Sequence, residues 1–255
     1  MDRRQRVRKV LLLVSLLAFP ATFYYFSPVL VLTAGAAGVV PGALVLFGVM
    51  AVTATVSGRA FCGWACPVGG LGELCSAVQN RPVSRRLSLI KYGIWFSWLA
   101  AVGLAIASAG GLRRVDFLYQ TASGLSLADG QSCFVYGIVL AVVLTLSLAA
   151  GRRAFCHTVC WMAPFMVVGA WLGDRLHLPS LGLQVQPSAC GECGRCTRDC
   201  PMSLDVAGMV GRGSLAHPEC ILCGRCVDSC PQGAIRLAFR RRGGSPAVGP
   251  AAGRQ

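Results

Sequence analysis

The stretch that decides how the C-terminal part of the chain folds is Cys190-Gly-Glu-Cys193-Gly-Arg-Cys196-Thr-Arg-Asp-Cys200-Pro201, and it occurs twice. The second copy reads Cys220-Ile-Leu-Cys223-Gly-Arg-Cys226-Val-Asp-Ser-Cys230-Pro231. Both follow the spacing C-x2-C-x2-C-x3-C-P, the run that holds [4Fe–4S] clusters in bacterial proteins. Three thiolates two residues apart can reach three corners of a cubane from one tight loop. The pattern therefore predicts two iron–sulfur clusters.

The fourth cysteine of each motif is expected to cross to the opposite cluster, as it does in two-cluster ferredoxins. The first predicted ligand set is Cys190, Cys193, Cys196 and Cys230, and the second is Cys200, Cys220, Cys223 and Cys226. The alternative is a pair of zinc sites, which rarely use eight cysteines at this spacing. We expect residues 176–239 to form a small α+β domain like a two-cluster bacterial ferredoxin.

The rest of the chain has the composition of a membrane protein. Of its 255 residues 55% are hydrophobic and only 13% are charged, and the mean hydropathy is +0.60. Soluble domains carry about 25% charged residues. The net charge of +14 comes from scattered basic residues between apolar runs, which argues against nucleic-acid binding. The 14 cysteines do not indicate a secreted disulfide scaffold, because such scaffolds are short and loop-rich.

Long uncharged runs predict four transmembrane helices. Residues 10–58 hold no charge and are long enough for two helices and a tight turn near residues 33–42, and residues 92–112 and 130–151 are each one helix long. Residues 161–173 are too short to span and suggest an interfacial or re-entrant helix. Loops 1–9 and 58–91 each carry a net charge of +4 and loop 111–132 carries none, so the positive-inside rule places both termini and the iron–sulfur domain in the cytoplasm, at the inner membrane.

A second cysteine pattern lies between these hydrophobic runs. The sequence Arg-Ala-Phe-Cys-x3-Cys begins at Arg59 and again at Arg153, 94 residues later, each time after a predicted helix. The fold class expected for residues 1–175 is therefore an all-α polytopic membrane domain with an internal duplication. Two such arms would meet on a pseudo-twofold axis and supply four thiolates to one shared redox site, either a third iron–sulfur cluster or a thiol pair system beside a quinone. The cysteines of this shared site are Cys62, Cys66, Cys156 and Cys160.

Simpler interpretations of this region remain open. The arm cysteines could only pack in buried turns, and His157 could be a proton acceptor or a hydrogen-bonded turn residue. Arg59, Arg152 and Arg153 would favour thiolate over thiol in the arms. Cys75 and Cys133 have no partner at such spacing and are expected to pack. Residues 240–255 carry no apolar pattern and are expected to be a disordered tail.

The chain resembles the NapH-type polytopic membrane ferredoxins. The resemblance rests on the four hydrophobic runs, Phe61-Cys62-Gly63-Trp64-Ala65-Cys66-Pro67, the second C-x3-C and the two C-terminal cysteine motifs. The second arm departs from the family pattern, because Trp161 follows Cys160 where the family often has proline. Related modules occur in nitrous-oxide-reduction regulators and in a methylamine-utilisation ferredoxin. The resemblance implies electron transfer between the quinone pool and a partner redox protein, as an electron-transfer subunit that can form part of a quinol dehydrogenase.

Two functions of other classes compete with electron transfer from quinol. One is an accessory or maturation factor that supplies electrons for assembly or reactivation of a metalloenzyme. The other is a redox sensor without catalytic flux. Cluster potentials span about −700 to +450 mV, so the motifs leave the direction of electron flow open.

Overall fold

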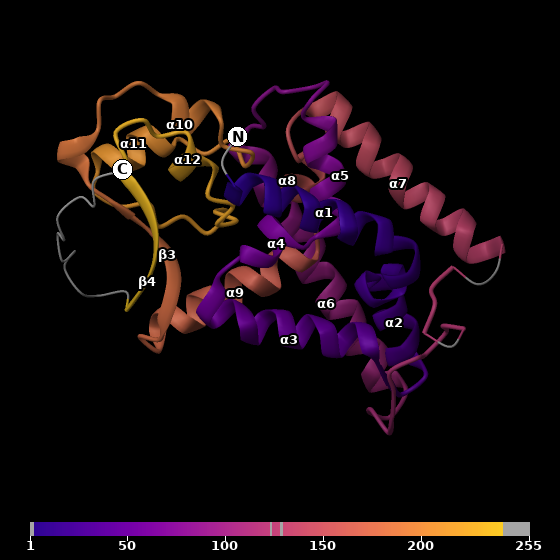
Figure 1. The fold of residues 1–255 in the computed structure, drawn as a ribbon. Helices are drawn as coiled ribbons and strands as arrows, with labels where there is room; N and C mark the ends of the chain where they lie inside the picture. The colour runs from indigo at the N-terminus through magenta and orange to yellow at the C-terminus, as the bar shows by residue number, and fades with distance from the viewer. Residues whose placement is uncertain (1–2, 123, 128–129, 242–255) are drawn as a thin grey trace.

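The computed structural model describes residues 3–122, 124–127 and 130–241 as a helical region that carries a small C-terminal domain (Figure 1). The helical region contains seven longer helices and two short ones. They are α1 Arg3–Thr22, α2 Pro28–Ala36, α3 Gly42–Ser57, α4 Ala60–Trp64, α5 Pro67–Cys75, α6 Ile90–Ser108, α7 Gly130–Ala150, α8 Ala154–Thr158 and α9 Met162–Arg175. Short 3-10 turns cover Phe23–Phe26 and Arg85–Leu89, and strands β1 Val39–Pro41 and β2 Arg114–Asp116 pair in parallel.

Three segments of the described chain are long and apolar enough to cross a membrane, which is one fewer than the sequence predicts. They are Arg3–Ala36, Leu87–Ser108 and Gly130–Ala150, whereas α3 has only 16 residues. The difference arises because the first span takes 34 residues and is broken in the middle. Pro28 lacks an N–H and pushes Ser27 out of the helical region, and the Ser27 hydroxyl then accepts a hydrogen bond from the Leu30 N–H at 3.3 Å.

Helix α9 packs along α3 rather than spanning the membrane alone. Its glycines face the α3 backbone so closely that a Cβ on Gly169 would lie 2.0 Å from the Ala51 carbonyl oxygen, and one on Gly173 would lie 2.1 Å from that of Thr55. This small-x3-small spacing lets two helices approach at backbone distance. The apolar stretch after Cys160 is therefore a 14-residue helix against α3.

The C-terminal domain combines one β-hairpin with short helices. Strands β3 Pro179–Val185 and β4 Ile235–Arg241 pair antiparallel, with Val185 opposite Ile235. Helices α10 Arg195–Arg198, α11 Val206–Gly211 and α12 Arg225–Asp228, with a 3-10 turn at Pro187–Ala189, lie between them. Strand β4 continues to Arg241, whereas residues 242–255 of the expected disordered tail lie outside the described residues. Figure 1 shows α1 beginning beside this domain.

Candidate redox centres

The two arms of the helical region adopt the same local backbone. In the first arm, the N–H groups of Ala65 and Cys66 both donate to the Phe61 carbonyl, at 2.9 and 3.0 Å. In the second arm, the N–H groups of Val159 and Cys160 both donate to the Phe155 carbonyl, at 3.0 and 3.1 Å. Each arm is thus one short helix, α4 or α8, that closes just before its second cysteine.

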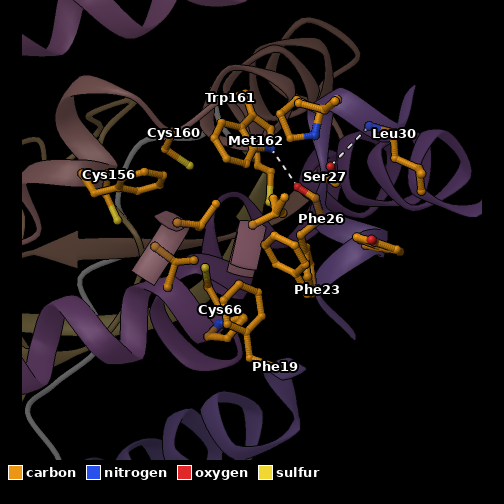
Figure 2. Close-up of a pocket in the computed structure, with 18 of the residues that line it drawn as sticks. Phe19, Phe23, Phe26, Ser27, Leu30, Cys66, Cys156, Cys160, Trp161 and Met162 are labelled. Atoms are coloured by element: carbon orange, nitrogen blue, oxygen red, sulfur yellow. Dashed lines mark hydrogen bonds between the residues drawn. The ribbon is translucent and has the colours of Figure 1, made fainter. Parts of the chain in front are cut away.

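The four arm cysteines line one cavity. Its volume is about 330 Å³. Figure 2 shows Cys66, Cys156 and Cys160 on one side and Phe23, Phe26 and Leu30 on the other. The Trp161 indole N–H donates to the Phe26 carbonyl at 3.0 Å (Figure 2). Phe26 lies at the break in the first span, next to the cavity. The structure therefore brings together all four cysteines of the predicted shared site, next to a largely aromatic wall.

Buried cations outnumber buried carboxylates around this cavity. Arg8 and Arg153 are fully buried, and both bind the single carboxylate of Glu73. Arg8 donates to Glu73 Oε2 at 2.8 Å and Arg153 to the same oxygen at 3.0 Å. The same two guanidinium groups also hold the first arm, since Arg8 donates to the Gly63 carbonyl at 3.2 Å and Arg153 to the Cys62 carbonyl at 2.9 Å. Burial opposes ionisation of Glu73, but the arginines lower its pKa to about 2.

A second group has the same imbalance. Glu219, which precedes Cys220, accepts from Arg59 Nη1 at 2.7 Å and from Lys91 Nζ at 2.5 Å, and all three side chains are buried. Burial opposes ionisation of Glu219, but the two cations lower its pKa to about 2. Each group thus places at least two cations against one carboxylate. Arg59 also lines the cysteine cavity. Its group therefore leaves an excess positive charge beside the four sulfurs, and an anionic centre bound there would neutralise that charge.

Burial raises the pKa of three of the four arm cysteines, Cys66, Cys156 and Cys160. Burial raises the pKa of Cys156, and this effect outweighs the opposing charge of Arg153. Burial, with Cys156 and Cys62 nearby, raises the pKa of Cys160 to about 12. No disulfide joins any of the 14 cysteines, all of which fall within the described ranges. His157 is buried, and neither of its ring nitrogens has a hydrogen-bond partner among the described residues.

The eight cysteines of the C-terminal domain surround two separate hollows. One hollow is lined by Cys190, Cys193, Cys196 and Cys230. The other is lined by Cys200, Cys220, Cys223 and Cys226. Each hollow therefore collects three cysteines from one motif and the fourth from the other.

The two C-terminal motifs also share an unusual backbone. Glu192 and Leu222 occupy equivalent positions, with φ of 51° and 50°, and each is followed two residues later by Gly194 or Gly224 with φ of 68° or 72°. Residues other than glycine uncommonly adopt the left-handed conformation. Both loops place one such residue two positions before a left-handed glycine, so the two loops curve in the same unusual way. A [4Fe–4S] cluster fits this donor set and this curvature.

The spacing of the thiols suits a cluster better than a single ion. Across residues 3–122, 124–127 and 130–241, no three His, Cys, Asp or Glu side chains approach closely enough to hold one metal ion. A zinc ion needs thiolates about 2.3 Å away, whereas a cubane holds its four thiolates at four different irons. Cys75 is buried on α5, whereas Cys133 is exposed on α7, and neither lines these three hollows.

The carboxylates that anchor the site were not singled out from the sequence. Glu73 is the one acidic residue of the loop 58–91, and Glu219 directly precedes a cysteine motif. The signal in the sequence was a lone carboxylate in an otherwise basic loop. Such a carboxylate is a candidate ion-pair partner, because a buried cation in a protein requires one. The signal could not reveal which distant arginines would bind it.

Comparison with known proteins identifies the class of protein. A profile described as "4Fe-4S binding domain" matches residues 39–87 and again 134–179, and a "4Fe-4S dicluster domain" profile matches residues 189–235. The chain is therefore an iron–sulfur protein of the ferredoxin type, with three described segments that are long and apolar enough to cross a membrane. These matches support its resemblance to the NapH-type membrane ferredoxins.

The curated relatives agree with this assignment. The methylamine utilization ferredoxin-type protein MauN of Methylorubrum extorquens is 28% identical over 68% of this chain and 59% of its own length. The putative electron transport protein YccM of Escherichia coli is 24% identical over 66% of this chain and 48% of its own. The ferredoxin-type protein NapH of Haemophilus influenzae is 23% identical over 69% of this chain and 60% of its own. The chain thus spans roughly half to three-fifths of these relatives, and no solved structure matches it.

Proposed function

We propose that this protein passes electrons between the quinone pool and a partner redox protein, through a redox site shared by the two arms and two [4Fe–4S] clusters in the C-terminal domain. The observation that carries the proposal is the meeting of Cys62, Cys66, Cys156 and Cys160 at one apolar cavity. Bound clusters would supply one-electron transfer. The residues of the chain hold these centres, exclude water and balance their charge.

The proposed shared site is a third iron–sulfur cluster. Four thiolates are the number that a [4Fe–4S] cluster requires, and a cluster held by thiolates is anionic. The positive charge left by Arg59, Lys91 and Glu219, and by Arg8, Arg153 and Glu73, would offset that charge in a buried position. The matching backbone of the two arms, and the two matches to one family profile, support the internal duplication that the site requires.

The side of the cavity away from the cysteines has the lining expected for the head group of a quinone. Ligand pockets in proteins measure about 300–1,000 Å³ and are mostly apolar with a few polar groups. Here the polar contribution comes from Tyr24, Ser27, Thr33, Gln120 and Arg59, and the rest is largely aromatic and aliphatic apart from the four cysteines. Oxidation of a quinol there would release two electrons and two protons, and reduction of a quinone would consume them. A quinone in this cavity would lie directly beside the four arm cysteines.

In the C-terminal domain we propose the crossed ligation described above, with one fourth ligand from each motif. The two hollows support it, because each is lined by the cysteines that crossing would bring together. The proposed domains are residues 1–175 and residues 176 to 241. They are separated by the short connection between α9 and β3.

For topology we propose that both termini and the iron–sulfur domain are cytoplasmic, with α3 as a fourth, short membrane segment packed on α9. The loop charges support this orientation through the positive-inside rule. A reporter protein fused after Gln255 tests it. Activity of a cytoplasm-dependent reporter is expected, and activity of a periplasm-dependent one alone would contradict the topology.

Electron exchange in proteoliposomes tests the proposed function. The purified protein is reconstituted with a long-chain quinone confined to the bilayer. Its tail clusters are followed by electron paramagnetic resonance while quinol reduces them or quinone reoxidises them. Exchange in at least one direction is expected. If clusters that dithionite reduces exchange no electrons with quinol or quinone, the function is instead that of an accessory factor or sensor.

A matched pair of variants links this exchange to the arms. Cys156→Ser removes a cysteine that lines the cavity, whereas Cys133→Ser removes an exposed cysteine on α7 outside it. The first is expected to lose exchange with quinone and keep dithionite reduction of the tail clusters. The second is expected to behave as wild type.

A further inference from the structure

Resting on the proposed function, we infer that the two cysteine sets of the C-terminal domain act in a fixed order. The set Cys200, Cys220, Cys223 and Cys226, here called the inner set, exchanges electrons with the shared site of the arms. The set Cys190, Cys193, Cys196 and Cys230, here called the outer set, exchanges electrons with the partner protein.

The first arm touches the loop of the inner set directly. The Trp64 indole N–H donates to the Leu222 carbonyl at 3.1 Å. A Cβ on Gly63 would lie 2.3 Å from the Ile221 carbonyl oxygen, so only glycine permits this approach. Cys62 is therefore connected to Cys223 through the backbone to Trp64, the Trp64 side chain and one hydrogen bond to Leu222.

Buried charges hold the same contact in place. Arg59 donates to the Pro218 carbonyl at 3.2 Å as well as to Glu219, and both residues lie just before Cys220. Arg152, at the start of the second arm, donates to the Cys200 carbonyl at 3.0 Å. The two arms therefore hold the inner set through both of the motifs that supply its cysteines.

The inner set is more buried than the outer set, as this order of electron transfer requires. Cys200, Cys223 and Cys226 are buried, and Cys220 is partly buried. In the outer set no cysteine is buried and Cys193 is exposed, with exposed Glu192 and Gln232 beside it. A soluble partner can approach only the outer set closely, because the arms cover the inner one.

The two sets adjoin one another through two short helices, one in each motif. Helix α10 carries Cys196 of the outer set, and Cys200 of the inner set follows two residues after it ends. Helix α12 carries Cys226 of the inner set, and Cys230 of the outer set follows two residues after it ends. Electrons would move one at a time between the shared site, the inner set and the outer set, and each centre is oxidised as the next is reduced. No bond forms or breaks after the quinol has released its protons.

The test follows each set separately in proteoliposomes that contain the long-chain quinone. Cys223→Ser removes an inner ligand and Cys193→Ser an outer one, and iron content with the spectrum after dithionite shows which cluster each variant keeps. After dithionite reduction, quinone is expected to reoxidise the inner set in Cys193→Ser. The outer set of Cys223→Ser is expected to stay reduced.

A milder pair of variants covers the case in which Cys223→Ser fails to fold. Trp64→Phe deletes the hydrogen bond to Leu222, and Trp98→Phe deletes an equivalent indole bond, to the Pro28 carbonyl at 3.0 Å, away from the tail. Slower reoxidation of both sets is expected only in Trp64→Phe, with unchanged iron content and spectra.

Two results would overturn the order. They are reoxidation of the outer set at the wild-type rate in Cys223→Ser, or equal rates in the two tryptophan variants. A wild type that exchanges no electrons with quinone would instead overturn the proposed function, and this order with it.

Discussion

Glu73 and Arg153 are 80 residues apart in the chain, and their side chains meet at 3.0 Å in a buried position. The same carboxylate binds Arg8, and Arg225 of the C-terminal domain lies 3.5 Å from it. Helices α1, α5 and α8 and the C-terminal domain therefore converge on one carboxylate. This convergence makes Glu73 the residue whose loss should affect the whole assembly.

Glu73→Gln should destabilise the protein by about 3–5 kcal/mol, because removing one partner leaves buried charges without compensation. Thermal unfolding in detergent measures the loss. Asp116→Asn is the matched control, since Asp116 pairs with Arg114 at 3.6 Å and their side chains are 37% and 69% exposed. That change should cost less than about 1 kcal/mol. Equal losses in the two variants would show that the Glu73 network does not stabilise the fold.

Acid should remove the contribution of Glu73 within a defined range. Its pKa is lowered from 4.5 to about 2 in the folded protein. A carboxylate with a lowered pKa stabilises the fold fully above its unfolded value, and loses that contribution as pH falls toward its folded value. The stability difference between wild type and Glu73→Gln should therefore be constant above about pH 5 and shrink between about pH 4.5 and 2. A difference that grew on acidification would contradict this assignment.

Gly169→Ala should separate α9 from α3. The new methyl group would lie 2.0 Å from a backbone oxygen that cannot rotate away, and overpacking of this kind costs about 1–3 kcal/mol. Gly48→Ala on α3 is the control, because no atom lies within 4 Å of the Cβ it would add. It should leave the melting temperature unchanged or raise it slightly. Unfolding curves of both variants in one detergent decide the matter.

Iron content should report the shared site of the arms. In anaerobically purified protein the two C-terminal clusters account for eight irons and a third [4Fe–4S] cluster for four more. A variant with serine at Cys62, Cys66, Cys156 and Cys160 should lose those four irons and keep eight. If wild type also holds eight, and electron exchange with quinone survives in the variant, the shared site does not exist.

Crossed ligation should appear in the spectra of single variants. Cys230→Ser should damage the cluster of Cys190, Cys193 and Cys196, because Cys230 lines their hollow. Cys200→Ser should damage the other cluster for the same reason. Electron paramagnetic resonance of the dithionite-reduced variants distinguishes them. Damage by Cys230→Ser confined to the cluster of Cys220, Cys223 and Cys226 would contradict the crossing.

Local features of the structure could be predicted from the sequence, whereas contacts between residues far apart in the chain could not. Cysteine spacing is dictated by the geometry of the centre it wraps, so it predicted iron–sulfur domains that the family profiles match. Hydropathy predicted apolar helices, and three described segments are long enough to span a membrane. It did not show that Pro28 interrupts the first span or that α3 has only 16 residues. Gly169-x3-Gly173 was a readable packing signal, but its partner on α3 was not.

The charged residues show the same limit most clearly. Arg59 and Arg153 were noticed for their effect on nearby thiols, whereas in the structure burial dominates the cysteines and the arginines bind distant carboxylates. The packing of the helices determines which carboxylate a buried arginine binds. Local sequence patterns do not predict that packing.

The attachment of the C-terminal domain has a consequence for how this protein works over time. Some redox proteins carry their cofactor on a mobile head that swings between two docking positions. Here Trp64, Arg59 and Glu73 hold the domain against the helices through a hydrogen bond and buried ion pairs. We expect the internal transfer steps to be insensitive to solvent viscosity, which slows swinging heads, so that only the encounter with the partner depends on diffusion.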